Sequence, residues 1–223
     1  SFTNSLLIEF INYINEKNKD RFLYSYTILY IIFCLIIAPF AFFFQIIAPV
    51  IFEIWTRDKI LFDPILFASL TSSFLIMIFY QPASMIVRGK NLFKEDLIIS
   101  IFTSILFALL LIFLLDIYSI RGAGYSLIIL EIFSCLFIFY FANKWLKKNF
   151  VRFYSKIILF SLADLIASNI FIFILIGNKI DDEYVIVTFI VYKLFVGICF
   201  VKLMPSKAKK KLFNLSKELF KTG

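Results

Sequence analysis

Three ionisable side chains lie deep inside long apolar stretches of this sequence, and their types could carry proton or ion chemistry. Glu131 and Asp164 are carboxylic acids and Lys193 is a primary amine, and each is flanked mainly by Ile, Leu, Phe and other apolar residues. A carboxylate can take up and release a proton, whereas a lysine can bind an anion or neutralise an acid. Their roles depend on the medium around them and on the elements that place them.

That medium is predicted to be a lipid bilayer. Of the 223 residues, 62% are hydrophobic and 17% are charged, which is more apolar surface than one soluble core can bury. Strands of a membrane barrel would be only about 9–11 residues long and would alternate polar with apolar side chains, whereas a helix spans a bilayer with about 20 apolar residues. We therefore predict an all-α polytopic membrane protein with six transmembrane helices, near 22–52, 65–87, 97–115, 123–142, 157–176 and 184–201.

Residues 22–203 are accordingly predicted to form a six-helix bundle with a segment on either side. Residues 1–21 begin mildly apolar and become charged, and we interpret them as the end of a preceding helix, the rest of which lies outside this sequence, followed by a cytoplasmic loop. Residues 204–223 combine Leu and Phe at helical spacing with lysines. This pattern predicts a basic amphipathic helix on anionic membrane lipids, with a disordered tail as the alternative.

The basic residues predict the orientation. Most of the 23 lysines and arginines lie before the first run, in alternate loops and after the last run, and the other loops are acidic. The positive-inside rule makes the basic side cytoplasmic, including the carboxyl terminus. The same distribution explains the net charge of +8 without nucleic-acid binding. Arg88 and Lys90, at the predicted cytoplasmic mouth, could be first contacts for an anionic head group or ordinary positive-inside anchors.

Counting along the predicted helices places the three buried ionisable groups at similar depth. At about 1.5 Å per residue, Asp164, Lys193 and Glu131 lie roughly 13, 15 and 16 Å from the cytoplasmic ends of their helices. An ionisable group at that depth costs several kcal/mol unless it is paired or faces water. Because Asp164 and Lys193 belong to consecutive antiparallel helices, we predict that they face each other. The pair is either purely structural or a charged wall of a substrate groove.

Glu131 has no obvious partner within the chain, which makes it the best single functional candidate. In a low-dielectric site such a carboxylate could couple transport to proton uptake. The alternative is that it pairs with a residue outside this sequence.

The sequence gives little support for metal, disulfide or enzyme chemistry. It has no histidine, and its three cysteines, Cys34, Cys135 and Cys199, all fall inside apolar runs without a CxxC motif. We therefore expect no metal site, disulfide or cofactor. Without histidine or an acidic pair at a cytoplasmic helix end, a membrane-embedded glycosyltransferase or acyltransferase is disfavoured.

The segment "DIYSIRGAGYS" predicts a tight turn on the outer side. Gly122, Ala123 and Gly124 lack the side-chain bulk that would keep two antiparallel helices apart. A glycine can also adopt the positive φ that ends a helix.

The order of these features resembles a known family. A helix with Pro39 and Pro49 runs into "IFEIWTRDKILFDP", a second ends in "MIVRGKNLFKED", and a third ends at "DIYSIRGAGYS". This layout is similar to the carboxyl-terminal domain of polysaccharide-biosynthesis flippases, the O-antigen and lipid-linked oligosaccharide translocases of the multidrug/oligosaccharidyl-lipid/polysaccharide exporter superfamily. For the ends of the second and third helices, the family patterns read "llaxGrxk" and "yGixGAA". In this sequence Ser119 stands where the second of these patterns has its first glycine. The loop after the first helix, "IWTRD", lacks the glycine that the family has there.

The resemblance implies a function and partners. Family members have 12 or 14 helices in two bundles, so this chain would be the last six helices plus a stub and would need the amino-terminal half of the same protein. The implied activity is flipping of a polyprenyl-pyrophosphate-linked oligosaccharide across the bacterial inner membrane by alternating access. The alternatives at this point are a drug/cation antiporter of the same superfamily, a membrane-embedded glycosyltransferase or acyltransferase, which the residues disfavour, and a scaffold that transports nothing.

Overall fold

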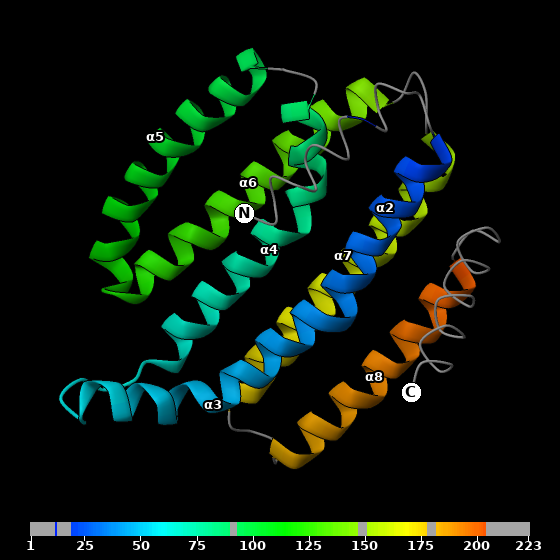
Figure 1. Ribbon diagram of the computed structural model, residues 1–223. Helices are drawn as coiled ribbons and strands as arrows, with labels where there is room; N and C mark the ends of the chain where they lie inside the picture. Colours follow the sequence, from blue (N-terminus) through cyan, green and yellow to red (C-terminus); the bar gives the residue numbers. More distant parts are fainter. Residues whose placement is uncertain (1–11, 13–18, 90–92, 147–150, 178–181, 204–223) are drawn as a thin grey trace.

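The protein folds into long helices that confirm the predicted all-α class. The computed structural model describes residues 12, 19–89, 93–146, 151–177 and 182–203 (Figure 1). Within these ranges every regular element is helical, and most of the connecting segments are short. The elements are α2 (Lys19–Ile32), a π-helix η1 (Phe33–Ile37), α3 (Ala38–Thr56), α4 (Pro64–Gly89), α5 (Phe93–Tyr118), α6 (Arg121–Leu146), α7 (Val151–Ile176) and α8 (Asp182–Leu203).

Six helical stretches in the described part of the chain are long and apolar enough to cross a membrane, as predicted. The shortest has 20 residues, which matches the roughly 20 residues that span the hydrocarbon core. The protein is thus a multi-pass membrane protein. The spans are Ser25–Thr56, Pro64–Gly89, Phe93–Tyr118, Arg121–Lys144, Lys156–Ile176 and Glu183–Lys202. The predicted segments 1–21 and 204–223 lie outside the described residues, except for Asn12 and the start of α2.

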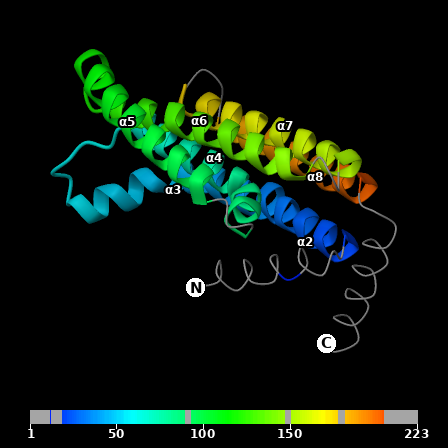
Figure 2. The same cartoon turned by 90° about the horizontal axis from the view of Figure 1, so that it is seen from above.

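The first span, Ser25–Thr56, is continuous but not straight. Ala38 donates its backbone N–H to Phe33 O, five residues back, in the wide turn of η1. Pro39 is the next residue. A proline has no backbone N–H to donate to the carbonyl four residues earlier, and in an α-helix its ring clashes with that carbonyl. The wider turn of η1 accommodates the proline ring. Pro49 lies further along α3, which turns away from the bundle in both views (Figures 1 and 2).

Helix α4 lies at the centre of the bundle. It packs most closely against α6, and it also contacts α7 and the first span. Helix α5 lies on the outer side of α6 (Figure 1) and buries only Ile99. On the other side, α8 packs against α7 and η1. The bundle therefore consists of an α4–α5–α6 group and a group formed by the first span, α7 and α8, which meet mainly through α4.

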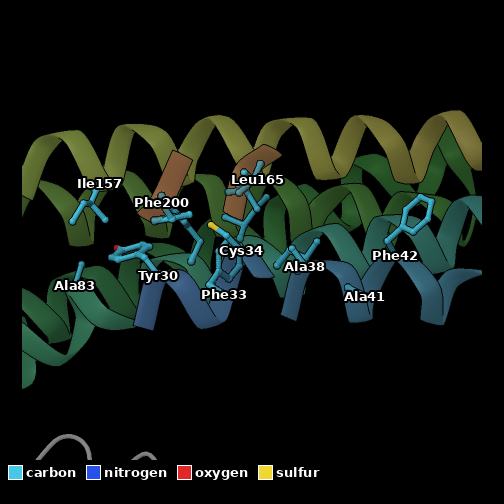
Figure 3. Packing of buried hydrophobic residues seen from close by; sticks show 14 of the residues in the cluster. Tyr30, Phe33, Cys34, Ala38, Ala41, Phe42, Ala83, Ile157, Leu165 and Phe200 are labelled. Atoms are coloured by element: carbon cyan, nitrogen blue, oxygen red, sulfur yellow. The ribbon is translucent and has the colours of Figure 1, made fainter. Parts of the chain in front are cut away.

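Aromatic and aliphatic side chains of the first span form the core against α7 and α8 (Figure 3). Phe42 stacks on Phe189 of α8, with 3.9 Å between the ring centroids, and Tyr30 contacts Phe79 of α4 edge-on. In a bilayer such packing stabilises helices through dispersion and shape fit, because lipid is as apolar as the side chains themselves. The core thus fixes how α7 and α8 face the first span.

The α5–α6 turn is tight, as predicted, but the positive φ does not fall on a glycine. Ser119 adopts φ 51°, and among the described glycines none has a positive φ. Gly122 serves close approach instead, because a Cβ there would lie 2.1 Å from the carbonyl oxygen of Leu114. A Cβ on Gly124 would lie 2.7 Å from Cβ of Ser69, so this glycine allows α6 to approach α4. Ala123 is half-buried beside them.

Candidate functional site: buried charges at membrane depth

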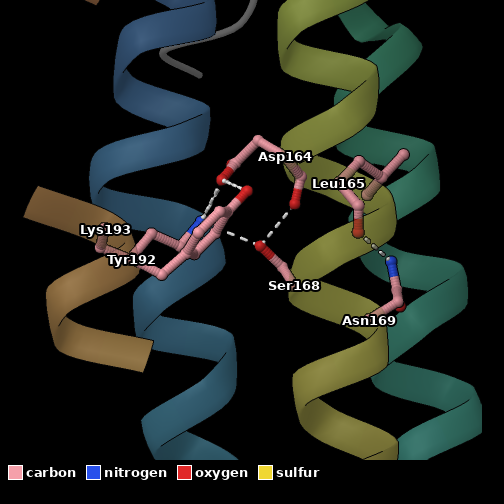
Figure 4. A network of polar contacts seen from close by, with 6 residues as sticks. All are labelled: Asp164, Leu165, Ser168, Asn169, Tyr192 and Lys193. Carbon is pink, nitrogen blue, oxygen red and sulfur yellow. Dashed lines mark hydrogen bonds and ion pairs between the residues drawn. The ribbon is translucent and has the colours of Figure 1, made fainter. Parts of the chain in front are cut away.

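Asp164 and Lys193 face each other and form an ion pair, as predicted (Figure 4). Lys193 Nζ lies 2.8 Å from Asp164 Oδ1, 2.9 Å from Asp164 Oδ2 and 2.9 Å from Ser168 Oγ. Tyr192 adds a fourth contact by donating its hydroxyl to Asp164 Oδ1 at 2.9 Å. Ser168 lies one turn after Asp164 on α7, so both side chains project from the same face of that helix.

This network neutralises itself. Asp164 is 1% exposed and Lys193 is 8% exposed, and both side chains lie between α7, α8 and the first span. An ammonium group has three N–H donors, and three acceptors surround Nζ. The rings of Phe189 and Tyr192 complete its surroundings, at 5.3 and 5.4 Å. With its donors engaged, Lys193 has little capacity for an anionic substrate, and the geometry favours the structural interpretation of the pair.

Glu131 has a partner that the sequence analysis missed. Tyr80 of α4 donates its hydroxyl to Glu131 Oε2 at 2.7 Å. Tyr80 lies about 14 Å from the Gly89 end of α4, close to the depth estimated for Glu131, but depth alone does not indicate which faces of α4 and α6 meet. Within the described residues Glu131 makes no ion pair. It is therefore a half-buried carboxylate held by a neutral donor.

The two polar groups are separate. Asp164 and Lys193 lie on the side of α7 that faces the first span and α8 (Figure 4), whereas Glu131 projects from α6 toward α4. No described hydrogen bond or ion pair joins them. The structure therefore places the predicted ionisable residues at two sites rather than around one cavity.

Arg88 takes part in a loose surface contact. Its Nε lies 3.9 Å from Asp96 Oδ2, and the two side chains are 59% and 36% exposed. Exposed pairs of this length contribute little to stability. Arg88 thus links the end of α4 to the start of α5, and Lys90 lies outside the described residues.

Asp63 joins the starts of α4 and α6 at the opposite end of the bundle. Its Oδ1 accepts the backbone N–H groups of Ile65 and Leu66 at 3.0 Å, as a helix N-cap does, and its Oδ2 accepts Arg121 Nε at 2.7 Å. Partial burial raises the pKa of this carboxyl, but the Arg121 hydrogen bond and charge and the two backbone donors outweigh burial, so the pKa lies below its ordinary value. We call this end of the bundle the Asp63 end.

Acid should weaken this connection. Because the folded-state pKa of Asp63 is below the unfolded value of 3.8, its contribution to stability is complete above that pH and is lost as the pH falls through the folded pKa. We expect the unfolding temperature in detergent to fall more steeply below pH 3.8 for the wild type than for Asp63→Asn, which keeps a cap but cannot titrate. Identical pH profiles for the two proteins would contradict this role.

Among the described residues, no three His, Cys, Asp or Glu side chains gather closely enough to hold a metal ion. The fold and these contacts define a multi-pass α-helical membrane protein with ionisable groups at membrane depth. Comparison of the chain with protein-family models, with curated proteins and with solved structures finds no match.

Proposed function

We propose that the protein flips a lipid-linked oligosaccharide across the bacterial inner membrane, as the carboxyl-terminal bundle of a two-bundle, alternating-access transporter with a cytoplasmic carboxyl terminus. The observation that carries a transport role is Glu131, a half-buried carboxylate within a membrane span that is bound by a hydroxyl rather than by a cation. Intramembrane ionisable residues of this kind mark substrate and proton pathways. The assignment to an oligosaccharide lipid rests on the order of sequence features.

Glu131 is suited to couple proton uptake to helix movement. It can gain or lose a proton without breaking a salt bridge, and its partner Tyr80 belongs to α4, which contacts both helix groups of the bundle. An ionised carboxylate accepts the Tyr80 hydroxyl, whereas a protonated one can itself donate. Each change of charge would therefore alter the contact between α4 and α6.

A cation or drug antiporter is the second candidate, and one observation favours it. Asp164 and Ser168 engage the donors of Lys193, whereas Glu131 is bound only by the Tyr80 hydroxyl. Among the three predicted ionisable residues, the acid Glu131 therefore has the least compensated charge. Acidic groups in a cavity suit cationic substrates, whereas a pyrophosphate needs cations.

Complementation tests the flippase proposal. The full-length parent gene should restore surface polysaccharide in a bacterium that lacks its own oligosaccharide-lipid flippase. Glu131→Gln should reduce it on the order of tenfold, because a carboxamide cannot exchange the proton. Tyr80→Phe should cause a smaller loss, and Glu183→Gln, at an exposed position on α8, should have no effect.

The outcomes separate the candidates. Full activity of a well-expressed Glu131→Gln variant would contradict the role of this carboxylate. If the parent gene restores no polysaccharide but protects cells from cationic drugs in a Glu131-dependent way, the antiporter is correct.

A further inference from the structure

A second feature at membrane depth is a groove of about 830 Å³ between α6 and α7, with α4 as its floor. Helices α6 and α7 diverge there and both pack on α4 instead of on each other. Along α7 the groove extends from Leu162 to Gly177, about 22 Å at 1.5 Å per residue. Its lining includes Ser72 and Ile76 from α4, Ile132 and Leu136 from α6, and Ile166 and Ile170 from α7.

The groove opens to the surface of the bundle within the membrane spans. Ile132, Ile166 and Ile170 on its rims are 44%, 54% and 53% exposed, and all three lie within membrane spans. Its lining is almost wholly apolar and contains no charged residue. The volume falls in the range of pockets that hold one small molecule, roughly 300–1,000 Å³. A hydrocarbon chain entering from the bilayer fits this site better than a charged solute from water.

Two residues of the lining each have a buried polar side-chain atom without a hydrogen-bond partner in the structure. Ser72 is 2% exposed and its Oγ makes no hydrogen bond, although a serine in a helix usually donates to a carbonyl one turn back. Asn169 uses Nδ2 to donate to Leu165 O at 2.8 Å, which leaves Oδ1 without a donor. Figure 4 shows Asn169 on the side of α7 away from Asp164.

These two atoms lie at one level. Ser72 and Asn169 are each about 11–12 Å along their helices from the Asp63 end, well inside the hydrocarbon region. A buried polar atom without a partner is destabilising, and water to satisfy it is scarce at this depth. A ligand that brings a hydrogen-bond donor would remove this cost.

We propose that the groove binds an uncharged single-chain amphiphile from the membrane, with its aliphatic chain along α6 and α7 and its hydroxyl or amide N–H donating to Asn169 Oδ1, which a rotation of the buried amide brings to the groove surface. The Ser72 hydroxyl can donate to the oxygen of the same ligand group. An ionised head group is disfavoured, because the lining offers no charge to compensate it. The site is independent of oligosaccharide transport and does not use the Asp164–Lys193 pair.

Photolabelling of the full-length protein in phospholipid nanodiscs tests the site. The first probe is a long-chain fatty alcohol with a diazirine in its chain, and the second is its methyl ether, which lacks the donor. We expect the alcohol to label the groove residues of α6 and α7 in preference to the exposed face of α8. Asn169→Leu should reduce this labelling about fivefold, the value of one neutral hydrogen bond. Ser72→Ala should give a smaller reduction.

A matched pair of variants controls for folding and access. Ile166→Trp fills the groove and should abolish its labelling, whereas Leu194→Trp, at an exposed position on α8, should leave it unchanged. Equal labelling by alcohol and ether would overturn the donor requirement, and so the proposal. Equal labelling of α8 and the groove would identify an ordinary lipid-facing surface. An unlabelled groove together with crosslinks between two copies would identify a protein interface instead.

Discussion

Replacement of Lys193 by methionine should lower the free energy of unfolding by about 3–5 kcal/mol, because it leaves the Asp164 carboxylate buried without its cation. Asp164 would keep the Tyr192 hydroxyl, but one neutral hydrogen bond cannot replace an ammonium group bound through both carboxylate oxygens. Ser168 would lose a donor as well. The measurement is unfolding of the purified protein by SDS titration in mixed micelles.

The double variant Lys193→Met with Asp164→Leu should recover most of this loss, since a well-packed apolar pair often equals a buried ion pair in stability. Lys94→Met removes an exposed lysine on α5 and should change stability little. If the single and double variants are equally unstable, packing rather than charge explains the effect. If the double variant folds well but surface polysaccharide is not restored, the charges act on the substrate, contrary to the self-neutralised geometry.

The second large effect is expected at Gly122. Alanine there places a Cβ 2.1 Å from Leu114 O and 2.8 Å from Leu115 N, and both are backbone atoms that cannot rotate away. The α5 and α6 backbones must separate, which we expect to cost about 3 kcal/mol, at the upper end of overpacking in a well-packed core. Helix α6 also carries Glu131, so activity should fall with stability.

Gly197→Ala on α8 is the matched control. A Cβ at this position would lie 3.7 Å from the nearest side-chain atom of Leu35, an ordinary contact. Because alanine favours a helix over glycine by about 1 kcal/mol, this variant should be as stable as the wild type or more stable. The same substitution is therefore expected to have opposite signs at the two glycines, and equal unfolding temperatures for both variants would refute the close-contact explanation.

The sequence was sufficient for features that depend on composition and on counting along a helix. The apolar runs predicted all six spans, although the run 97–115 extends in the structure to Phe93–Tyr118, because polar residues at both ends continue the helix. Depth counting also paired Asp164 with Lys193, since their helices are consecutive and antiparallel.

Contacts between helices that are not consecutive in the sequence could not be predicted by counting depth along a helix. The Tyr80–Glu131 hydrogen bond and the groove both depend on the way in which α6 packs against α4 and diverges from α7, and periodicity does not encode which faces meet. The positive φ at Ser119 was missed for another reason. The residues that mark the turn by composition, Gly122, Ala123 and Gly124, begin three positions later, while the positive φ falls on Ser119, which tolerates it less well than a glycine.

The π-helix in the first span has a consequence for insertions and deletions. A π turn holds one residue more than an α turn, and each residue advances an α-helix by about 100°. Because the extra residue is accommodated within one turn, deleting one residue between Phe33 and Ile37 would convert the segment into ordinary helix and leave Phe42 facing Phe189. A deletion within α2 removes no such extra residue, and it would rotate Phe42 by about 100° relative to the residues before the deletion. The π turn thus makes this segment a place in the span where the loss of a single residue preserves the facing of the helix.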